Sequence, residues 1–328
     1  MKKFFIFLTV ATLTWIGSYG VINAGILENF TNNKVILENS YIVINGFRTT
    51  IDEYKKTHST KIYGGYGDGK KVSNNMVTIN GIDDDHLVIY GGWAGSTDGI
   101  AERNIVTIND GKVDKICGGY AADARNNIVN MYGGNVHSIY GGDCGTLAFH
   151  AGEGHGMENN IINIYGGKII RSFGWAGSII AGHGDSRGNT INIYNYPDLE
   201  DADMIVALDN WDGTNPEDNN SINVYTKGIM VNEARGFQQI NFFLPDNIVN
   251  GEAVFSVKSK KTDLSGVTVK VHLPGNSTLK RGDSVYLLNN RNGIKLRSDT
   301  RFVVTSDDSR SFKCLLSGNG CHLIAIVQ

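Results

Sequence analysis

The side chains best suited to bind a metal lie in a long insertion, residues 143–159, and in the equivalent later segment. These candidate ligands are His150, Glu153, His155, Glu158, His183 and Asp185. The insertion is rich in glycine and lacks the helical histidine spacing that places two imidazoles on one face. No Asp-rich nonapeptide of the calcium-binding kind repeats. We therefore expect no metal site and no cofactor.

Carboxylates are densest at Asp83-Asp84-Asp85. Parallel β-helices that cleave polysaccharides gather carboxylates and a basic residue on one face. The acidic run lies between two repeated segments, which favours a solvated loop, and no such cluster recurs elsewhere. We therefore expect no catalytic residues.

Aromatic residues form two outward-facing columns when the repeats are aligned. Contacts between neighbouring repeats explain such columns without any ligand, whereas an exposed strip of rings can also bind sugars or a partner protein. The first column contains Tyr63, Tyr90, Tyr140 and Phe173. The second column, the candidate ligand-binding strip, contains Tyr66, Trp93, Tyr120 and Trp175.

Two cysteines near the C-terminus are candidates for a disulfide. Cys314 and Cys321 flank a turn-like segment, 315–320, and an exported chain meets oxidising conditions. A hairpin disulfide and a pair of thiols are the two alternatives.

Two short motifs alternate between residues 60 and 225, and the first reads Asn-x-Val/Ile-Thr/Asn followed by Ile, Met or Val. Strand side chains alternate between faces, so its third and fifth residues face inward, and by the same parity so does the leading Asn. Stacked rungs then place these residues in a structural asparagine ladder. Its members are Asn75, Asn104, Asn127, Asn160, Asn189 and Asn220.

The second motif is Ile-Tyr-Gly-Gly. Copies begin at Ile62, Ile89 and Ile139, a variant with Cys begins at Ile116, and Ser172-Phe173-Gly174 reads as a degenerate copy. Paired glycines fit corners where the backbone takes a positive φ or passes close to the next rung. A phosphate-binding loop is a poor alternative, because such a loop opens a helix and strands are expected here.

The spacing of the motifs predicts a stacked coil. The step from leading Asn to second motif is 12 residues both from Asn104 to Ile116 and from Asn127 to Ile139, whereas the return to the next Asn takes 11 residues after Ile116 and 21 after Ile139. Insertions confined to one leg are typical of solenoids, because extra residues bulge out at one corner. We predict an all-β fold, a single-stranded right-handed parallel β-helix with an all-β C-terminal cap.

Composition agrees with short strands and tight turns. Glycine supplies 41 of 328 residues and proline only 4, whereas glycine averages about 7% in proteins. Lys and Arg number 30 against 33 Asp and Glu. This near balance gives no reason to expect a nucleic acid as partner.

The N-terminus reads as an export signal. Lys2 and Lys3 precede an apolar run, 4–16, which is too short for a membrane span of ~20 residues, and Ala24 fits a cleavage site. We divide the chain into signal peptide (1–24), N-terminal cap (25–59), β-solenoid repeats (60–225) and C-terminal all-β capping unit (226–328). The exported chain is expected at the cell surface, in the outer membrane or outside the cell, without an integral membrane span.

The two motifs, following a signal peptide, resemble the passenger repeats of autotransporter adhesins from Gram-negative bacteria. The likeness continues through 236–242, 249–251, 262–266 and 281–288, which are similar to the segment that closes those passengers. About 40 residues follow Leu288, too few for the dozen strands of a membrane barrel. The resemblance is therefore to a passenger that lacks the C-terminal barrel.

This resemblance implies a secreted or cell-surface structural or adhesive β-solenoid that is not an enzyme. The expected partner is a host or bacterial surface protein or a glycan. Two alternatives stay open: a carbohydrate-active β-helix enzyme (polysaccharide lyase or hydrolase), and a truncated remnant of a longer autotransporter. Carboxylates from adjacent rungs that converge with a Lys or Arg would favour the enzyme.

Overall fold

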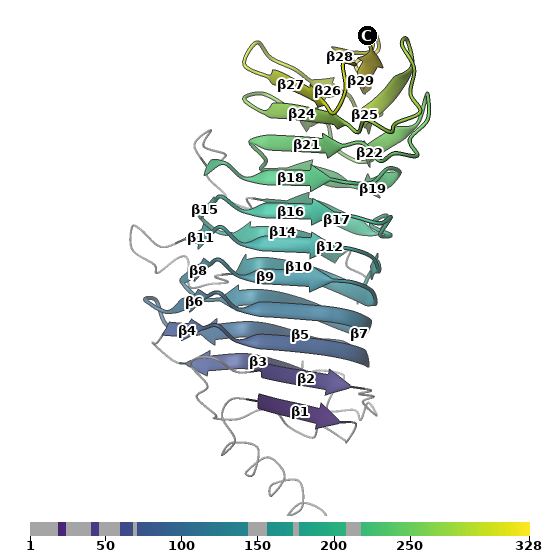
Figure 1. Cartoon of the computed structure of the whole chain (residues 1–328). Coiled ribbons are helices and arrows are strands. Elements are labelled where there is room, and N and C mark those ends of the chain that lie inside the picture. The colour runs from purple at the N-terminus through teal and green to yellow at the C-terminus, as the bar shows by residue number, and fades with distance from the viewer. Residues whose placement is uncertain are drawn as a thin grey trace, which may run out of the picture.

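The computed structural model describes residues 60–67, 71–143, 156–172, 177–207 and 218–328, and the backbone of two strands at 19–23 and 41–45. Every element in these ranges is a β-strand, and most strands pair in parallel with a strand one rung away. The strands stack into a β-solenoid (Figure 1), which confirms the predicted fold class. None of the described residues forms a helix long and apolar enough to span a membrane.

The largest sheet consists of two parallel stacks that merge where β5 (Met76–Ala94) and β7 (Ile105–Tyr120) run through both. The front stack in Figure 1 also contains β1 (Tyr19–Asn23), β2 (Tyr41–Asn45), β9 (Ile128–Met131), β12 (Ile161–Ile164), β16 (Thr190–Ile193), β18 (Ser221–Val224), β21 (Gln239–Phe243), β24 (Thr268–Leu273) and β27 (Arg301–Ser306). The second stack contains β3 (Thr60–Gly67), β10 (Asn135–Asp143), β13 (Lys168–Ile169), β14 (Gly177–His183), β17 (Ala202–Val206) and β20 (Glu233–Arg235). Because β1 lies within the predicted signal peptide, cleavage after Ala24 would remove it from the stack.

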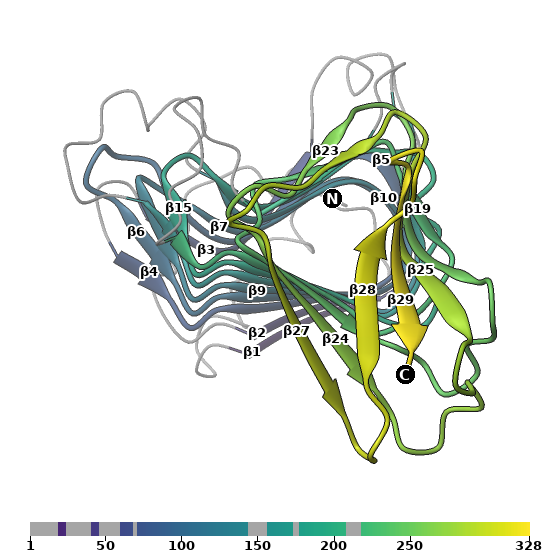
Figure 2. The same ribbon diagram turned by 90° about the horizontal axis from the view of Figure 1, so that it is seen from above.

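Smaller sheets complete each turn. A limb that projects beside the second stack (Figure 2) contains β4 (Lys71–Ser73), β6 (Ile100–Glu102), β8 (Asp123–Arg125), β11 (Met157–Glu158) and β15 (Ser186–Arg187). Near the C-terminus, a five-stranded sheet contains β19 (Ile229–Val231), β22 (Ala253–Val257), β25 (Ser284–Asn290), β28 (Phe312–Leu316) and β29 (His322–Val327). A two-stranded sheet contains β23 (Thr262–Asp263) and β26 (Ile294–Lys295).

The core follows from the alternation of the first motif. In the rung of β9, Val129 and Met131 are fully buried, whereas Asn130 between them is partly exposed. The same pattern repeats in each rung, so that one continuous core of Ile and Val runs the length of the solenoid. Burial of an Ile or Val side chain stabilises a fold by roughly 1.5 to 3 kcal/mol.

The paired glycines are required by close packing and not by a positive φ. A Cβ on Gly91 would lie 2.5 Å from the carbonyl oxygen of Gly118, one rung away. A Cβ on Gly119 would lie 2.4 Å from the side-chain nitrogen of Asn127. The first glycine therefore lets successive rungs approach each other, and the second makes room for the asparagine ladder.

The degenerate copy at Ser172-Phe173-Gly174 was a wrong alignment. In the structure β10 pairs with β14, so that Ile139 lies opposite Ile179 and Gly142 opposite Gly182. The copy of the second motif is therefore 179–182, in which Ile, Ile, Ala and Gly stand for Ile-Tyr-Gly-Gly. The alignment erred because the constant step of earlier rungs does not hold after Asn160.

The parallel stack continues beyond residue 225, since β18 pairs with β21, β21 with β24 and β24 with β27. Only the last elements change direction: β29 pairs antiparallel with both β25 and β28.

The structure also overturns the disulfide alternative, because Cys314 and Cys321 are both free thiols. Cys314 lies opposite Ala325 in the β28–β29 hairpin. Cys321 is four positions away from Ala325, roughly 13 Å along an extended strand, whereas a disulfide needs Cα atoms within about 7 Å.

Candidate functional site

The six leading asparagines form a buried ladder. Each precedes the start of a front-stack strand and follows a residue of positive φ, such as Asn126 with φ 56° before Asn127. Asn127 accepts hydrogen bonds at Oδ1 from the backbone N and the Nδ2 of Asn104, each at 3.0 Å. Its own N and Nδ2 donate to Oδ1 of Asn160, each at 3.0 Å, and Nδ2 also donates to the Ala101 carbonyl at 2.9 Å.

All six members are fully buried: Asn75, Asn104, Asn127, Asn160, Asn189 and Asn220. The ladder ends at Gln238, whose Oε1 accepts from the Asn220 backbone at 2.8 Å. Their polar atoms are committed to neighbouring rungs, so these amides hold the solenoid together and do not form a binding site.

Two aromatic columns meet across the bend at the paired glycines. Tyr66, Trp93 and Tyr120 stack with interplanar angles of 1° and 2° and centroid separations of 4.6 and 5.9 Å. In the other column Tyr63 stacks on Tyr90 at 5.4 Å and contacts Tyr66 edge to face at 5.2 Å. Phe173 and Trp175 lie outside the described residues.

Neither column is continuous. The buried Cys117 separates Tyr90 from Tyr140 in the first, and Asp143 and His183 follow Tyr120 in the second. The aromatic strip therefore gives way to ionisable side chains.

A cluster of three ionisable side chains lies beyond this strip. Lys115 Nζ is 2.5 Å from Asp143 Oδ2 and 4.0 Å from the centre of the Tyr140 ring, and His183 Nδ1 is 2.9 Å from Asp143 Oδ1. Burial alone would raise the pKa of the Asp143 carboxyl, but Lys115 and His183 outweigh it and hold that pKa well below its usual range. Burial favours the neutral form of Lys115, yet Asp143 raises the pKa of its ammonium group. The cluster is thus a charged ion pair joined by an imidazole.

The carboxylate of Glu102 is also held in the ionised form. Glu102 is 2.7 Å from Lys71 Nζ and 3.1 Å from Arg125 Nε, and these contacts outweigh its burial and lower the pKa of its carboxyl. Glu158 binds Arg187 one rung further on. Along the limb, Glu102, Arg125, Glu158 and Arg187 occupy one register position, so that charges alternate from rung to rung.

The acidic run 83–85 is not a solvated loop. It lies within β5, and Asp84 is 4% exposed and accepts a hydrogen bond from the backbone of His86 at 3.0 Å. Of the candidate metal ligands, His150, Glu153 and His155 lie outside the described residues. Within the described ranges, no group of three or more His, Cys, Asp or Glu side chains is placed to hold a metal ion.

The outward surface of the front stack carries regular columns that the sequence interpretation missed. Directly after the first motif, five aromatic rings stack at centroid separations of 4.4 to 4.6 Å: Tyr132, Tyr165, Tyr194, Tyr225 and Phe243. Beside them runs an outer amide ladder, in which each Nδ2 after the first donates to the Oδ1 of the rung before: Asn130, Asn163, Asn192, Asn223 and Asn241. On the other side of the outer amide ladder, the pairing of neighbouring strands aligns an apolar column: Met76, Ile105, Ile128 and Ile161.

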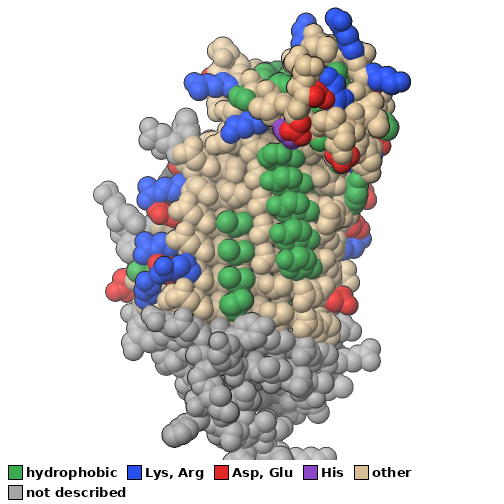
Figure 3. All heavy atoms as spheres, viewed as in Figure 1, with side chains coloured by type: hydrophobic (Ala, Val, Ile, Leu, Met, Phe, Trp, Pro, Cys, Tyr) green, Lys and Arg blue, Asp and Glu red, His purple; other side chains and the backbone are tan. Residues whose placement is uncertain are grey.

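We call this surface, made by those three columns, the ladder face. Figure 3 shows two columns of hydrophobic side chains along it, separated by polar ones. Met76 is 40% and Tyr132 52% exposed. The sequence signal for the aromatic column is the Tyr that directly follows four copies of the first motif.

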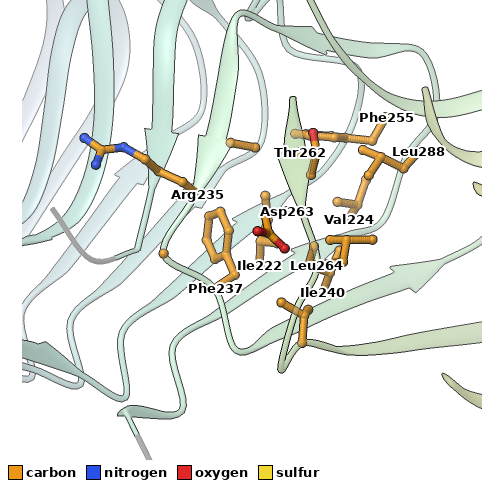
Figure 4. A pocket seen from close by; sticks show the side chains of 13 residues that line it. Ile222, Val224, Arg235, Phe237, Ile240, Phe255, Thr262, Asp263, Leu264 and Leu288 are labelled. Atoms are coloured by element: carbon orange, nitrogen blue, oxygen red, sulfur yellow. The ribbon is translucent and has the colours of Figure 1, made fainter. Parts of the chain in front are cut away.

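A small cavity of about 30 Å³ lies within the last parallel rungs. Its apolar lining includes Ile222, Phe237 and Leu264, with Asp263 beside them (Figure 4). A volume near that of one water molecule is far below the roughly 300 Å³ or more of small-molecule sites. The cavity is a packing defect.

Comparison with known proteins finds no family model, no curated relative and no solved structure that matches the chain.

Proposed function

We propose that this chain is an exported structural or adhesive β-solenoid of the bacterial surface, without catalytic activity, which binds a partner through the ladder face. The observation that carries the proposal is the ladder face itself, where exposed Met76 and Tyr132 belong to apolar columns that flank an outer amide ladder. Contiguous apolar surface with ordered polar groups is typical of interaction sites.

The stacking geometry favours a protein partner over a glycan. Sugar rings bind to the open faces of aromatic rings, but in this column neighbouring rings cover each other at 4.4 to 4.6 Å and present their edges and hydroxyls. Edges, methyl groups and amides suit the side chains and backbone of a protein surface. Near balance of charge argues against nucleic acid.

Adhesion is tested with beads coated with the purified protein and applied to an epithelial cell monolayer. We expect Met76→Ser with Tyr132→Ser to reduce the number of bound beads by about tenfold. The matched control is Val249→Ser, which removes a 50% exposed side chain outside the ladder face. If the double variant binds as well as the wild type, the ladder face is not the adhesive surface.

Export is tested separately. Expressed with its own N-terminus in a Gram-negative host, the chain is expected outside the cytoplasm with Gly25 as its first residue, by cell fractionation and mass spectrometry. A full-length chain that stays in the cytoplasm would contradict the proposal.

One observation favours a second function, that of a carbohydrate-active enzyme. Asp143, with Lys115 and His183 in contact, adjoins an aromatic strip. Against it, every described carboxyl whose pKa clearly departs from its usual value is shifted downward, whereas a general acid needs a raised pKa. Cleavage of polygalacturonate or alginate that Asp143→Asn abolishes would establish the enzyme instead.

A further inference from the structure

The last strand of the parallel stack, β27, has an unpaired edge. Within the described ranges it pairs with β24 alone. At its two ends, Arg301 N donates to the Val267 carbonyl at 3.0 Å and Asp307 N to the Leu273 carbonyl at 3.2 Å. Backbone groups alternate in direction along a strand, so the N–H and C=O groups of Phe302, Val304 and Ser306 point away from the solenoid.

This edge lacks the features that normally prevent edge-to-edge pairing. Residues 302–306 contain no proline and no charge, β27 shows no register shift against β24, and Phe302 and Val303 are 37% and 42% exposed. Natural edge strands are usually short, charged or interrupted by a bulge. In Figure 2, β27 and β28 diverge, so β28 does not run along this edge.

The charges at the ends of β27 are complementary under a twofold rotation. Arg301 begins the strand, is exposed and has no carboxylate partner within the described ranges, whereas Asp307 follows its end with a side chain that is 57% exposed. In an antiparallel pair of two β27 strands with Val304 on the axis, Phe302 lies opposite Ser306 and Arg301 opposite Asp307. The last two form a pair without backbone hydrogen bonds, whose Cα atoms lie about 4.5 Å apart.

We propose that β27 pairs antiparallel with β27 of a second copy of this chain, so that two solenoids join tail to tail. The interface is isologous, since the same edge is paired in both chains. It closes at a dimer, because no open β27 edge is left for a third chain. It extends the sheet by backbone hydrogen bonds, as in strand addition, and two Arg301–Asp307 pairs fix its register. This surface is separate from the ladder face, so either proposal can fail without the other.

The test is the mass of the full chain by light scattering after gel filtration over a range of concentrations. We expect twice the 35.7 kDa of one chain. Arg301→Asp and Asp307→Arg each place like charges opposite each other and should raise the dimer dissociation constant by at least about tenfold. The double variant Arg301→Asp/Asp307→Arg restores opposite charges and should recover the wild-type constant, an effect that a merely local structural role of either residue would not give.

Val304→Pro tests the backbone pairing. It removes an N–H that points to the open edge and no hydrogen bond to β24, so the monomer should stay folded, with only the packing of the partly buried Val304 side chain weakened, while the dimer is lost. A wild-type chain that stays monomeric, a mass above that of a dimer, or a folded double variant that does not recover association would each overturn the proposal.

Discussion

Replacement of Asn127 by Ala removes one step of the buried asparagine ladder. Four side-chain hydrogen bonds disappear: two that Oδ1 accepts from Asn104, and two that Nδ2 donates to Asn160 and Ala101. Asn160 Oδ1 keeps the bond from the Asn127 backbone, and Asn104 Nδ2 keeps a bond of 3.3 Å to the Val72 carbonyl. The Asn104 N–H and the Ala101 carbonyl lose their side-chain partner in a fully buried site.

A buried polar group without a partner costs about 1 to 3 kcal/mol. The sequence alone predicts a loss of about 1 to 3 kcal/mol for Asn127→Ala or Asn160→Ala, because each inward Asn would leave its ladder neighbours with unpaired polar groups. Two affected groups and a small void raise the expected loss of unfolding free energy for Asn127→Ala to about 3 to 5 kcal/mol.

Urea unfolding followed by far-ultraviolet circular dichroism measures this loss. The matched control is Asn130→Ala, which interrupts the outer amide ladder where water can replace the lost bonds; we expect a loss below about 1 kcal/mol. Equal midpoints for Asn127→Ala and Asn130→Ala would refute the reasoning, because the two ladders would then be equally hydrated.

Three further outcomes are expected. Gly119→Ala should lower the unfolding free energy by about 1 to 3 kcal/mol, because its Cβ would overlap the ladder, whereas Gly318→Ala, with no atom within 4 Å, should change it little in the same urea assay. Burial raises the pKa of the Tyr194 phenol to about 12. The unfolded chain then loses this proton first, so stability is complete below pH 10 and falls between about pH 10 and 12, measurable from melting midpoints against a Tyr194→Phe control. Cys314 and Cys321 should both react with a thiol reagent in denaturant, and a reductant should leave the melting midpoint unchanged.

The periodicity of the first motif was sufficient to predict most of the fold. Alternation in 127–131 assigns Asn127, Val129 and Met131 to one side of a strand, and repetition requires that side to be the interior. The sequence also predicts corners at the paired glycines of the second motif. A positive φ and the close approach of another rung both require glycine, so only the structure shows which of the two applies.

Other features depend on the register between rungs. Motif spacing predicts this register only while the extra residues of each rung fall between the second motif and the next leading Asn. The leg after Asn160 is longer before its second motif, so Ile179 and not Ser172 pairs with Ile139. Asp143 and His183 are 40 residues apart and meet only because β10 and β14 pair. Similarly, a tyrosine follows four of the six copies of the first motif, and no single rung reveals that these rings stack.

The inner and outer ladders run in opposite directions. In the inner ladder the Nδ2 groups of the first four members donate toward the C-terminal rung, as from Asn127 to Asn160, whereas in the outer ladder Asn163 donates back to Asn130. A chain of aligned amides polarises its members and adds their dipoles, so each ladder alone would build a field along the solenoid axis. Two antiparallel dipole chains on either side of one sheet largely cancel that field. The solenoid can therefore lengthen by further rungs without accumulating charge separation between its ends.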